Sequence, residues 1–266
     1  MNLMKTKDDV TLNYRTTGEG DAILLLHTAF DNFSVFTELE KALSRDYQVV
    51  LLDLRGHGYS DKLTSIQFED YASDIKQLLD KLYIDDCAVI GHELGASVAV
   101  AFAAQYPDMV TSLNLVNPTI LEDSLPADRL YEHYAHKIRN WDEEKQEKFL
   151  DKHLYYSKRE GKKFLKQISE TNSLNTDNEN QAVRDSFINT NIRHYLGEIK
   201  VPTLITAGQH GERTTIVEAK EVADYVPHAQ FKVFEKSGLY PFAEERTQFL
   251  KVAVDFIKAH EPEGAR

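Results

Sequence analysis

Residues Val89 to Pro107 read VIGHELGASVAVAFAAQYP, in which a short apolar run ends at a glycine and a longer run of small residues follows. Gly91 and Gly95 each lie two positions from Glu93. Glycines at this spacing allow a strand to reverse sharply into a helix while the central residue is held in a strained backbone conformation. We therefore predict a buried strand that ends at Gly91, a sharp turn at Glu93 and a helix that begins at Leu94.

On both sides of this turn the chain alternates between apolar runs and segments with helical spacing. The apolar runs are short and continuous, which is typical of strands that are buried on both faces of a parallel sheet. Strands of this kind, separated by helices, predict right-handed crossovers that cover the sheet on both sides. Two runs near the N-terminus, separated by Asp8 and Asp9, predict an edge hairpin. The predicted strands are residues 3–7, 10–16, 22–27, 47–54, 87–91, 110–117, 202–208 and 229–235, and the predicted helices are residues 34–44, 68–82, 94–106, 216–226 and 243–260.

The alternation stops between residues 119 and 200. This segment is polar, has helical spacing and is rich in tyrosine and histidine. Open α/β sheets bind their ligands beyond the carboxyl ends of the strands. We therefore expect residues 119–200 to form a helical lid over that edge, inserted into a core made of residues 1–118 and 201–266.

Composition argues against several classes of function. The 266 residues are 42% hydrophobic and 28% charged, which fits a globular chain with one large α/β domain. No apolar run reaches about 18 residues, and no apolar stretch follows the first few residues, so we expect no membrane span, no secretory signal and a cytoplasmic location. The net charge of −12, without a basic cluster, argues against nucleic acid as a partner. Cys87 is the one cysteine, which excludes an internal disulfide, and its apolar neighbours favour a core position.

Five motifs, taken with the order of the elements, carry a family resemblance. They are LLLHTAF (24–30), LLDLRGHGYSD (51–61), GHELGA (91–96), VPTLITAGQHGE (201–212) and KSGLYPFAEE (236–245). Together they resemble the α/β-hydrolase fold in its lidded branch of esterases, haloperoxidases and dehalogenases, over nearly the whole chain. The resemblance implies an α/β fold with a mostly parallel central sheet flanked by helices and an inserted helical lid. In the second motif we expect His57 to be structural, with Asp53 and Arg55 fixing the turn through a local ion pair or hydrogen bonds.

The residues that the family uses for hydrolysis are replaced in this chain. The resemblance implies a nucleophile in the sharp turn, an acid after the strand at 202–208 and a histidine after Ser237-Gly238. At these positions the chain has Glu93, Gly211 and Leu239, and Glu212 is the candidate for a displaced acid. In the oxyanion loop, Thr28 stands where the family commonly has a glycine. A serine-esterase mechanism is therefore not supported.

Glu93 stands at the amino end of the predicted helix, where free backbone N–H groups attract an anion. We expect its carboxylate to fold back onto these groups, chiefly the N–H of Leu94, and so to fill the oxyanion hole. Thr28, Ala29, Leu94 and Tyr240 are the residues that we expect to line a ligand site. No cofactor is expected.

Three hypotheses of function stay open. The first, which we favour, is a protein that binds a small molecule in the cleft under the lid, or has a regulatory role, without triad chemistry. The second is an active hydrolase or lyase-type enzyme in which Glu93 works with His27 or His210. In that arrangement Glu93 and His210 could also hold a metal, although we expect none. The third is a module that binds a protein partner through the acidic, tyrosine-rich lid. The ligand and the oligomeric state do not follow from the sequence.

Overall fold

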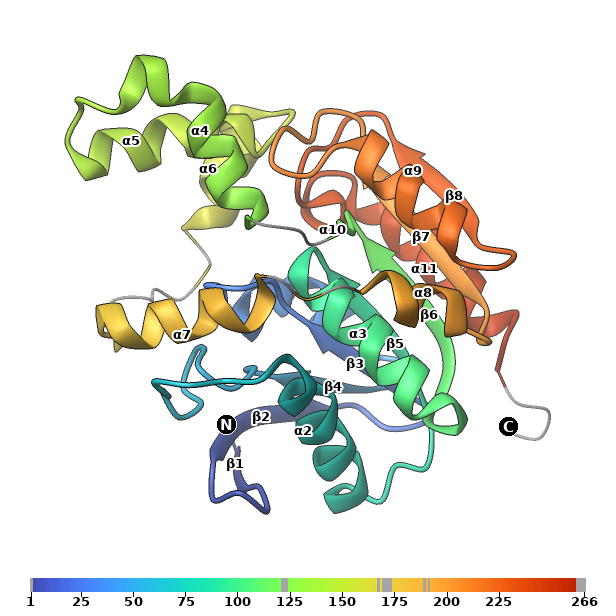
Figure 1. Ribbon diagram of the computed structural model, residues 1–266. Coiled ribbons are helices and arrows are strands. Elements are labelled where there is room, and N and C mark those ends of the chain that lie inside the picture. The colour runs from blue at the N-terminus through green and yellow to red at the C-terminus, as the bar shows by residue number, and fades with distance from the viewer. Residues whose placement is uncertain are drawn as a thin grey trace.

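The computed structural model describes residues 2–120, 124–166, 168, 174–188, 190 and 192–261. Its strands are β1 (Asn2–Lys5), β2 (Thr11–Thr17), β3 (Ala22–Leu26), β4 (Gln48–Leu52), β5 (Cys87–His92), β6 (Val110–Val116), β7 (Thr203–Gly208) and β8 (Gln230–Phe234). They form one sheet in the order β1-β2-β4-β3-β5-β6-β7-β8 (Figure 1). Strands β3 to β8 pair in parallel, while β1 and β2 form an antiparallel hairpin at one edge and β2 pairs antiparallel with β4. The predicted mostly parallel central sheet with an edge hairpin is confirmed.

Helices separate most of these strands, as the alternating sequence pattern predicts. Among the described residues, no helix is long and apolar enough to cross a bilayer. The α-helices are α1 (Thr37–Leu43), α2 (Phe68–Lys81), α3 (Leu94–Gln105), α4 (Pro126–Ile138), α5 (Glu143–Leu150), α6 (Lys158–Leu165), α7 (Asp177–Phe187), α8 (Arg193–Glu198), α9 (Ile216–Tyr225), α10 (Pro241–Glu244) and α11 (Arg246–Lys258), with short 3-10 turns η1 (Phe33–Phe36), η2 (Pro107–Met109) and η3 (Asp151–His153).

Strand β3 shows how the sheet is covered on both faces. All five of its residues are buried. Because side chains alternate along a strand, Leu24 and Leu26 belong to the core cluster that includes α2, α3 and α9, whereas Ile23 and Leu25 belong to the cluster that includes α1 and α11. Strand β5 is packed in the same way, with Val89 in the first cluster and Ile90 in the second, so the turn at its end follows a strand with apolar packing on both sides.

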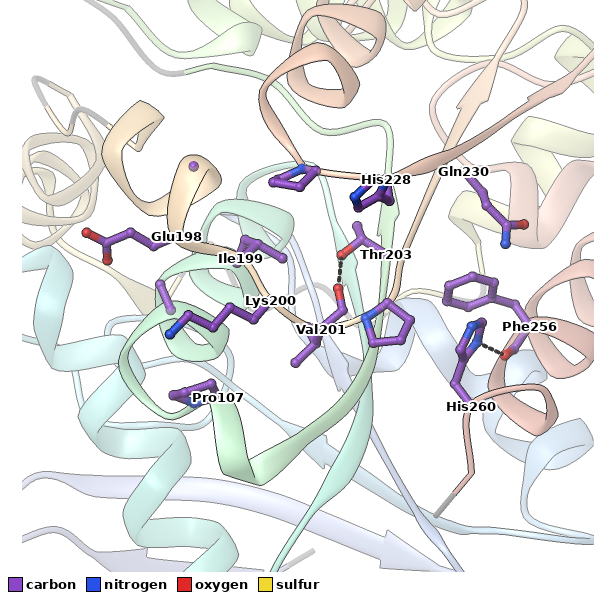
Figure 2. Close-up of a pocket in the computed structure, with 14 residues that line it drawn as sticks. Pro107, Glu198, Ile199, Lys200, Val201, Thr203, His228, Gln230, Phe256 and His260 are labelled. Atoms are coloured by element: carbon purple, nitrogen blue, oxygen red, sulfur yellow. Dashed lines mark hydrogen bonds between the residues drawn. The ribbon is translucent and has the colours of Figure 1, made fainter. Parts of the chain in front are cut away.

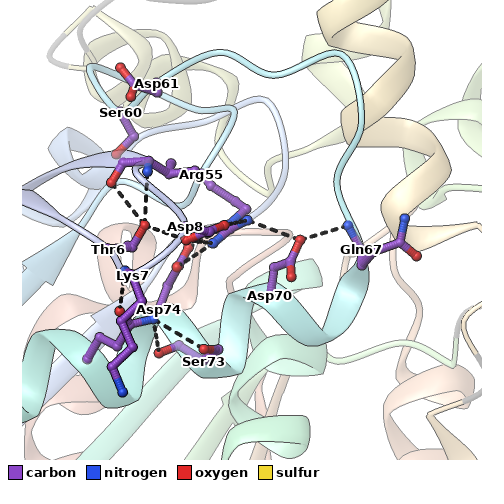
Figure 3. A network of polar contacts seen from close by, with 12 residues as sticks. Thr6, Lys7, Asp8, Arg55, Ser60, Asp61, Gln67, Asp70, Ser73 and Asp74 are labelled. Atoms are coloured by element: carbon purple, nitrogen blue, oxygen red, sulfur yellow. Dashed lines mark hydrogen bonds and ion pairs between the residues drawn. The ribbon is translucent and has the colours of Figure 1, made fainter.

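The turn after β4 is fixed by Arg55 in a way that the sequence did not predict (Figure 3). Arg55 does not pair with Asp53. It donates two hydrogen bonds to Asp74 on α2, at 2.6 and 2.7 Å, and forms 3.0 Å ion pairs with Asp8 and Asp70. These contacts fasten the turn to α2 and to the edge hairpin, so the network supports the fold.

Asp53 holds the same turn through backbone groups. Its carboxylate accepts hydrogen bonds from the N–H groups of Phe33 and Tyr59, at 2.8 and 2.9 Å. A side chain at Gly58 would lie 2.2 Å from this carboxylate, and Gly58 has φ +50°. The motif around the turn is thus explained by local structure.

Residues 119–200, called the insert below, connect β6 to β7 with helices α4 to α8. In Figure 1, α4, α5 and α6 form a separate lobe, and α7 lies below it. Phe187 of α7 stacks on Tyr71 of α2, with ring centroids 5.2 Å apart. The carbonyl of Leu154 accepts a 2.7 Å hydrogen bond from the Leu239 N–H. One part of the insert thus packs on the core helices and another part is fastened to the loop before α10.

Candidate functional site

The turn at Glu93, called the elbow below, joins β5 to α3. Glu93 has φ 49° and ψ −108°, a conformation that residues with side chains rarely adopt. A Cβ atom on Gly91 would lie 2.6 Å from the carbonyl oxygen of Gly95. A Cβ atom on Gly95 would lie 2.4 Å from the carbonyl oxygens of Leu26 and His27. Both positions require glycine, which explains the spacing seen in the sequence.

The Glu93 side chain is fully buried and ion-paired. Its Oε2 atom accepts hydrogen bonds from the Thr28 hydroxyl, at 2.5 Å, and from Nη2 of Arg213, at 2.8 Å. Its Oε1 atom has no hydrogen-bond partner within the described residues. Because Arg213 belongs to the loop after β7, a cation from a distant part of the chain neutralises the elbow carboxylate.

The prediction that Glu93 bonds directly to the N–H groups of its helix is wrong. Glu93 makes no side-chain hydrogen bond to α3, and the N–H of Leu94 points instead at the Thr28 hydroxyl, at 3.4 Å. A hydroxyl has one proton to donate and can accept in return. Thr28 donates to Glu93, accepts from Leu94 and therefore stands between the anion and the helix end. The backbone donor that forms an oxyanion hole in this fold is thus occupied by a side chain of the protein itself.

Arg213 is the residue that the sequence analysis missed. It lies 120 positions from Glu93 along the chain, so no local pattern connects the two. One signal was available, because a buried carboxylate needs a cation or several donors to offset its lost hydration. The loop from residue 209 to residue 215 contains one arginine and no lysine, and it follows the strand whose end lies near the elbow.

His27 is not hydrogen-bonded to Glu93. Its Nδ1 atom lies 2.7 Å from the Thr28 carbonyl oxygen, and its Nε2 atom accepts a 3.1 Å hydrogen bond from the N–H of Leu54. Both ring nitrogens are therefore committed to the backbone. Burial lowers the pKa of His27 to about 4, so the ring is neutral at pH 7 and braces the oxyanion loop.

His92 adjoins Glu93 in the chain but faces another loop. Its Nε2 atom lies 2.8 Å from the carbonyl oxygen of Leu239. Burial lowers the pKa of His92 to about 3. His92 is thus a neutral donor that holds the loop before α10.

His210 and Gly211 do not form a catalytic pair with the elbow. His210 is exposed, and its ring lies 4.6 Å from the ring of Tyr156, centroid to centroid. A Cβ atom on Gly211 would lie 2.2 Å from the carbonyl oxygen of Thr214, so an aspartate at this position would require the loop to move. Within the part of the chain that the structure describes, no three His, Cys, Asp or Glu side chains are grouped as metal ligands.

Glu212 contacts the insert instead of the elbow. Its carboxylate lies 2.9 Å from Nδ1 of His153 and accepts a 2.5 Å hydrogen bond from the Tyr134 hydroxyl. Its role in this structure is to join the insert to the loop after β7. Its place as a displaced acid stays a prediction without a supporting contact.

Leu239 fills the position where the resemblance implies a histidine. It is fully buried, and its carbonyl accepts a 2.7 Å hydrogen bond from Asn117. The next residue, Tyr240, stacks on Tyr155 of the insert with ring centroids 5.5 Å apart, and its hydroxyl donates to Asp31 at 3.3 Å. Ala29 and Leu94, also predicted to line a ligand site, are buried in the apolar core.

Arg213 and the polar side chains with which it interacts electrostatically come from the core and from the insert. We call them the central cluster: Asp31, Glu93, Asp151, Tyr155, Arg213 and Tyr240. Burial and the nearby Glu93 carboxylate raise the pKa of Asp31 to about 7, although Arg213 acts in the opposite direction. Burial also raises the pKa of Asp151. The Tyr155 hydroxyl is buried without a hydrogen-bond partner among the described residues.

Arg213 connects the central cluster to the surface. Its side chain is 15% exposed and lines a groove of about 370 Å³ that also includes Arg129 and His133 of α4 and Glu218 of α9. A larger groove, of about 960 Å³, lies elsewhere (Figure 2). It includes Thr203 at the start of β7, so it lies at the amino ends of the parallel strands, opposite to the elbow. Of these two grooves, the smaller one is adjacent to the elbow, because Arg213 lines it and is paired with Glu93.

Acyl-transfer chemistry needs a group that takes a proton and returns it. The residues bonded to Glu93 are a threonine hydroxyl and a guanidinium, and a guanidinium does not release its proton in proteins. The central cluster contains two buried polar atoms without a hydrogen-bond partner among the described residues, the Oε1 atom of Glu93 and the hydroxyl of Tyr155.

Comparisons with known proteins agree on the architecture. A family model described as alpha/beta hydrolase fold matches residues 21–245. The chain is 39% identical over 121 residues to the 2-(acetamidomethylene)succinate hydrolase of Mesorhizobium japonicum, and the alignment covers 44% of each protein, less than half of that relative's length. It is 23% identical over 269 residues to the 3-oxoadipate enol-lactonase 1 of Acinetobacter baylyi, covering 97% of each.

A solved structure gives the same result at the level of the fold. The enol-lactonase from Burkholderia xenovorans superposes on the chain with a TM-score of 0.80 and 23% identity, covering 97% of this chain and 100% of that one. This likeness concerns the fold alone.

Proposed function

We propose that this chain, which belongs to the alpha/beta hydrolase fold family, binds a small molecule at the central cluster and does not hydrolyse it by a serine-type mechanism. One observation carries the proposal. The elbow side chain is a carboxylate already bonded to Thr28 and Arg213, and neither ring nitrogen of His27 is free to serve it. Loss of the histidine alone typically costs a triad enzyme on the order of 10⁴ or more in rate.

Size and chemistry of the groove support a binding role. Its volume of about 370 Å³ falls in the range of roughly 300–1,000 Å³ that is common for small-molecule sites. It leads from solvent to Arg213, the residue that is paired with the elbow carboxylate. A ligand that binds the folded chain and not the unfolded chain raises the midpoint temperature of thermal unfolding.

The test uses the unaltered chain with 4-nitrophenyl acetate and 4-nitrophenyl butyrate. We expect no release of 4-nitrophenol above the rate in buffer, and we expect thermal stabilisation by at least one member of a panel of small metabolites. Ester turnover by the unaltered chain, in a preparation free of other esterases, would contradict the proposal.

A second candidate is an active hydrolase, and the names of the relatives favour it. Both sequence relatives described above are named as a hydrolase or a lactonase. In this case the free Oε1 atom of Glu93 takes a proton from water while the water oxygen attacks the carbonyl carbon of an ester or lactone. The C–O bond to the alcohol part then breaks, and the protonated Glu93 returns the proton to the leaving alkoxide. Turnover that disappears in Glu93→Gln but persists in Asp255→Asn, an exposed position on α11, would select this candidate.

A further inference from the structure

The groove of about 370 Å³ beside the elbow is lined by a cation with unused hydrogen-bond donors, Arg213. A guanidinium carries five N–H groups. Among the described residues, Arg213 donates one hydrogen bond, from Nη2 to Glu93 at 2.8 Å. Its Nη1 atom has no partner there and is not one of the buried unpartnered atoms, so it is accessible to solvent. Both protons of Nη1 are therefore free for a group that enters the groove.

A second arginine, Arg129 of α4, lines the same groove. Its Nη2 atom donates hydrogen bonds to Glu218 and to the Thr119 hydroxyl, and its Nη1 atom donates to the Ser124 carbonyl at 3.4 Å. Its Nε atom has no acceptor in the part of the chain that the structure describes, and it is not one of the buried unpartnered atoms. Arg129 therefore offers a second charged donor to a ligand in the groove.

The carboxylates that line the groove already have donors of their own. At Oε1, Glu218 accepts hydrogen bonds from Arg129 and from the Thr119 hydroxyl. At Oε2 it accepts from the N–H and the hydroxyl of Thr215, at 2.7 and 2.9 Å. These donors match the roughly four lone-pair sites of a carboxylate. Glu212, the other carboxylate of the groove, is bonded to side chains of the insert.

We propose that this groove binds a small organic carboxylate, which accepts hydrogen bonds from Nη1 of Arg213 and from Arg129. This inference rests on the proposed function, since it names the class of the ligand. The unused groups of the groove are charged donors, and a carboxylate is the charged acceptor that guanidinium groups bind most strongly. Glu93 keeps its own bond, because it uses Nη2 of Arg213 and the ligand uses Nη1. The second arginine offsets the repulsion between the ligand and the buried Glu93 carboxylate.

The charge of the whole chain works against this preference. A net charge of −12 attracts cations to the surface and repels anions. Unspecific binding would therefore favour an ammonium over a carboxylate of the same length. The sign of the measured preference thus distinguishes the groove from the overall charge.

The experiment compares three probes of similar size, pentanoate, pentanamide and n-pentylammonium, by isothermal titration calorimetry at low salt. We expect pentanoate to bind at least about tenfold more tightly than each of the other two. Pentanamide has the same carbon chain and a carbonyl oxygen but no charge, so its difference from pentanoate measures the contribution of the charged hydrogen bonds.

Two variants remove the donors separately. Arg213→Lys keeps a cation for Glu93 but has no second nitrogen for the ligand, and Arg129→Gln removes the other guanidinium. Each should weaken the binding of pentanoate about tenfold. Arg246→Gln is the matched control, because it also removes an arginine that is paired with a glutamate, and Arg246 does not line this groove. It should leave the affinity unchanged.

The outcomes separate this inference from the proposed function. Tighter binding of pentanamide or n-pentylammonium than of pentanoate overturns the carboxylate class and leaves a binding function in place. The inference is also overturned if pentanoate does not bind, if folded groove variants keep the full affinity, or if Arg246→Gln loses as much affinity as they do. Circular dichroism verifies the fold of each variant, and because two separate arginines are tested, a folding failure of one leaves the other to decide. Ester turnover by the unaltered chain contradicts the proposed function, whichever probe binds.

Discussion

Removing one partner of the Glu93–Arg213 ion pair should destabilise the protein strongly. In Arg213→Met the guanidinium is lost, and a fully buried carboxylate keeps the Thr28 hydroxyl as its hydrogen-bond donor among the described residues. An uncompensated buried charge costs about 3–5 kcal/mol. We expect about 3 kcal/mol, at the lower end, because Arg213 is 15% exposed and water can enter where its side chain was. Glu93→Gln should cost about 2 kcal/mol, since the remaining guanidinium stays partly hydrated.

The double variant distinguishes a buried pair from two independent side chains. With both charges removed, no unpaired ion is left, so the double variant should cost much less than the sum of the two single changes. We expect the double variant to cost about 2 kcal/mol in free energy of unfolding, which corresponds to a coupling of about 3 kcal/mol between the two positions. The free energy of unfolding is measured by guanidinium chloride denaturation, monitored by circular dichroism. Its slope against denaturant concentration should be the same in all variants.

The exposed pair Lys220–Asp224 on α9 is the control. Its side chains are 58% and 66% exposed, so the same cycle at these positions should give a coupling below about 0.5 kcal/mol. Additive costs for Glu93→Gln and Arg213→Met would refute the reasoning. The reasoning would also be refuted if the free energy of unfolding of Arg213→Met were within about 0.5 kcal/mol of that of the unaltered chain. A carboxylate that tolerates the loss of its cation is not a buried, charged group.

Three further changes test other parts of the site. Thr28→Ala removes the acceptor of the Leu94 N–H and should lower the free energy of unfolding by about 1–3 kcal/mol, whereas Thr28→Ser keeps the hydroxyl and should cost less. Chemical denaturation measures both variants. Equal costs would contradict the role of the Thr28 hydroxyl between Glu93 and Leu94. Gly95→Ala places a Cβ atom 2.4 Å from two carbonyl oxygens and should cost about 3 kcal/mol or prevent folding, while Gly197→Ala, with open space around it, should be neutral or slightly stabilising. Asp31→Asn should raise the stability more at about pH 8 than at about pH 5.5, by about 1–2 kcal/mol. With a folded pKa of about 7, Asp31 holds a proton that the unfolded chain releases, so the unaltered protein gains stability as the pH falls below 7 and the variant does not. A constant difference across this range would contradict the raised pKa.

The fold follows from patterns that lie close together in the chain. The continuous apolar run that ends in β5 predicts a strand buried on both faces, and all six residues of β5 are buried. The elbow follows from Gly91 and Gly95, because both approach backbone atoms too closely for any side chain. Such constraints act within a few residues, so a single sequence displays them.

The partners of Glu93 could not be predicted in the same way. The sequence places a carboxylate at the amino end of α3, and a direct bond to the helix is then the simplest expectation. In the folded protein the side chain meets Thr28, and Thr28 satisfies Leu94 instead. The choice depends on the unusual φ of 49° at Glu93 and on the position of Arg213 after folding, and neither is encoded in a local pattern.

The chain offers a physical reason why an arginine, and not a histidine, is paired with the elbow carboxylate. Buried imidazoles near the elbow are neutral, since burial lowers the pKa of His27 to about 4 and that of His92 to about 3. A neutral ring cannot offset the charge of Glu93, whereas a guanidinium stays charged when it is buried. The same property removes the proton shuttle, because a group that never releases its proton cannot pass one to a leaving group. The partner of Glu93 can either stay charged and offset the carboxylate, or exchange a proton and support acid–base catalysis. Arg213 meets the first of these requirements and not the second.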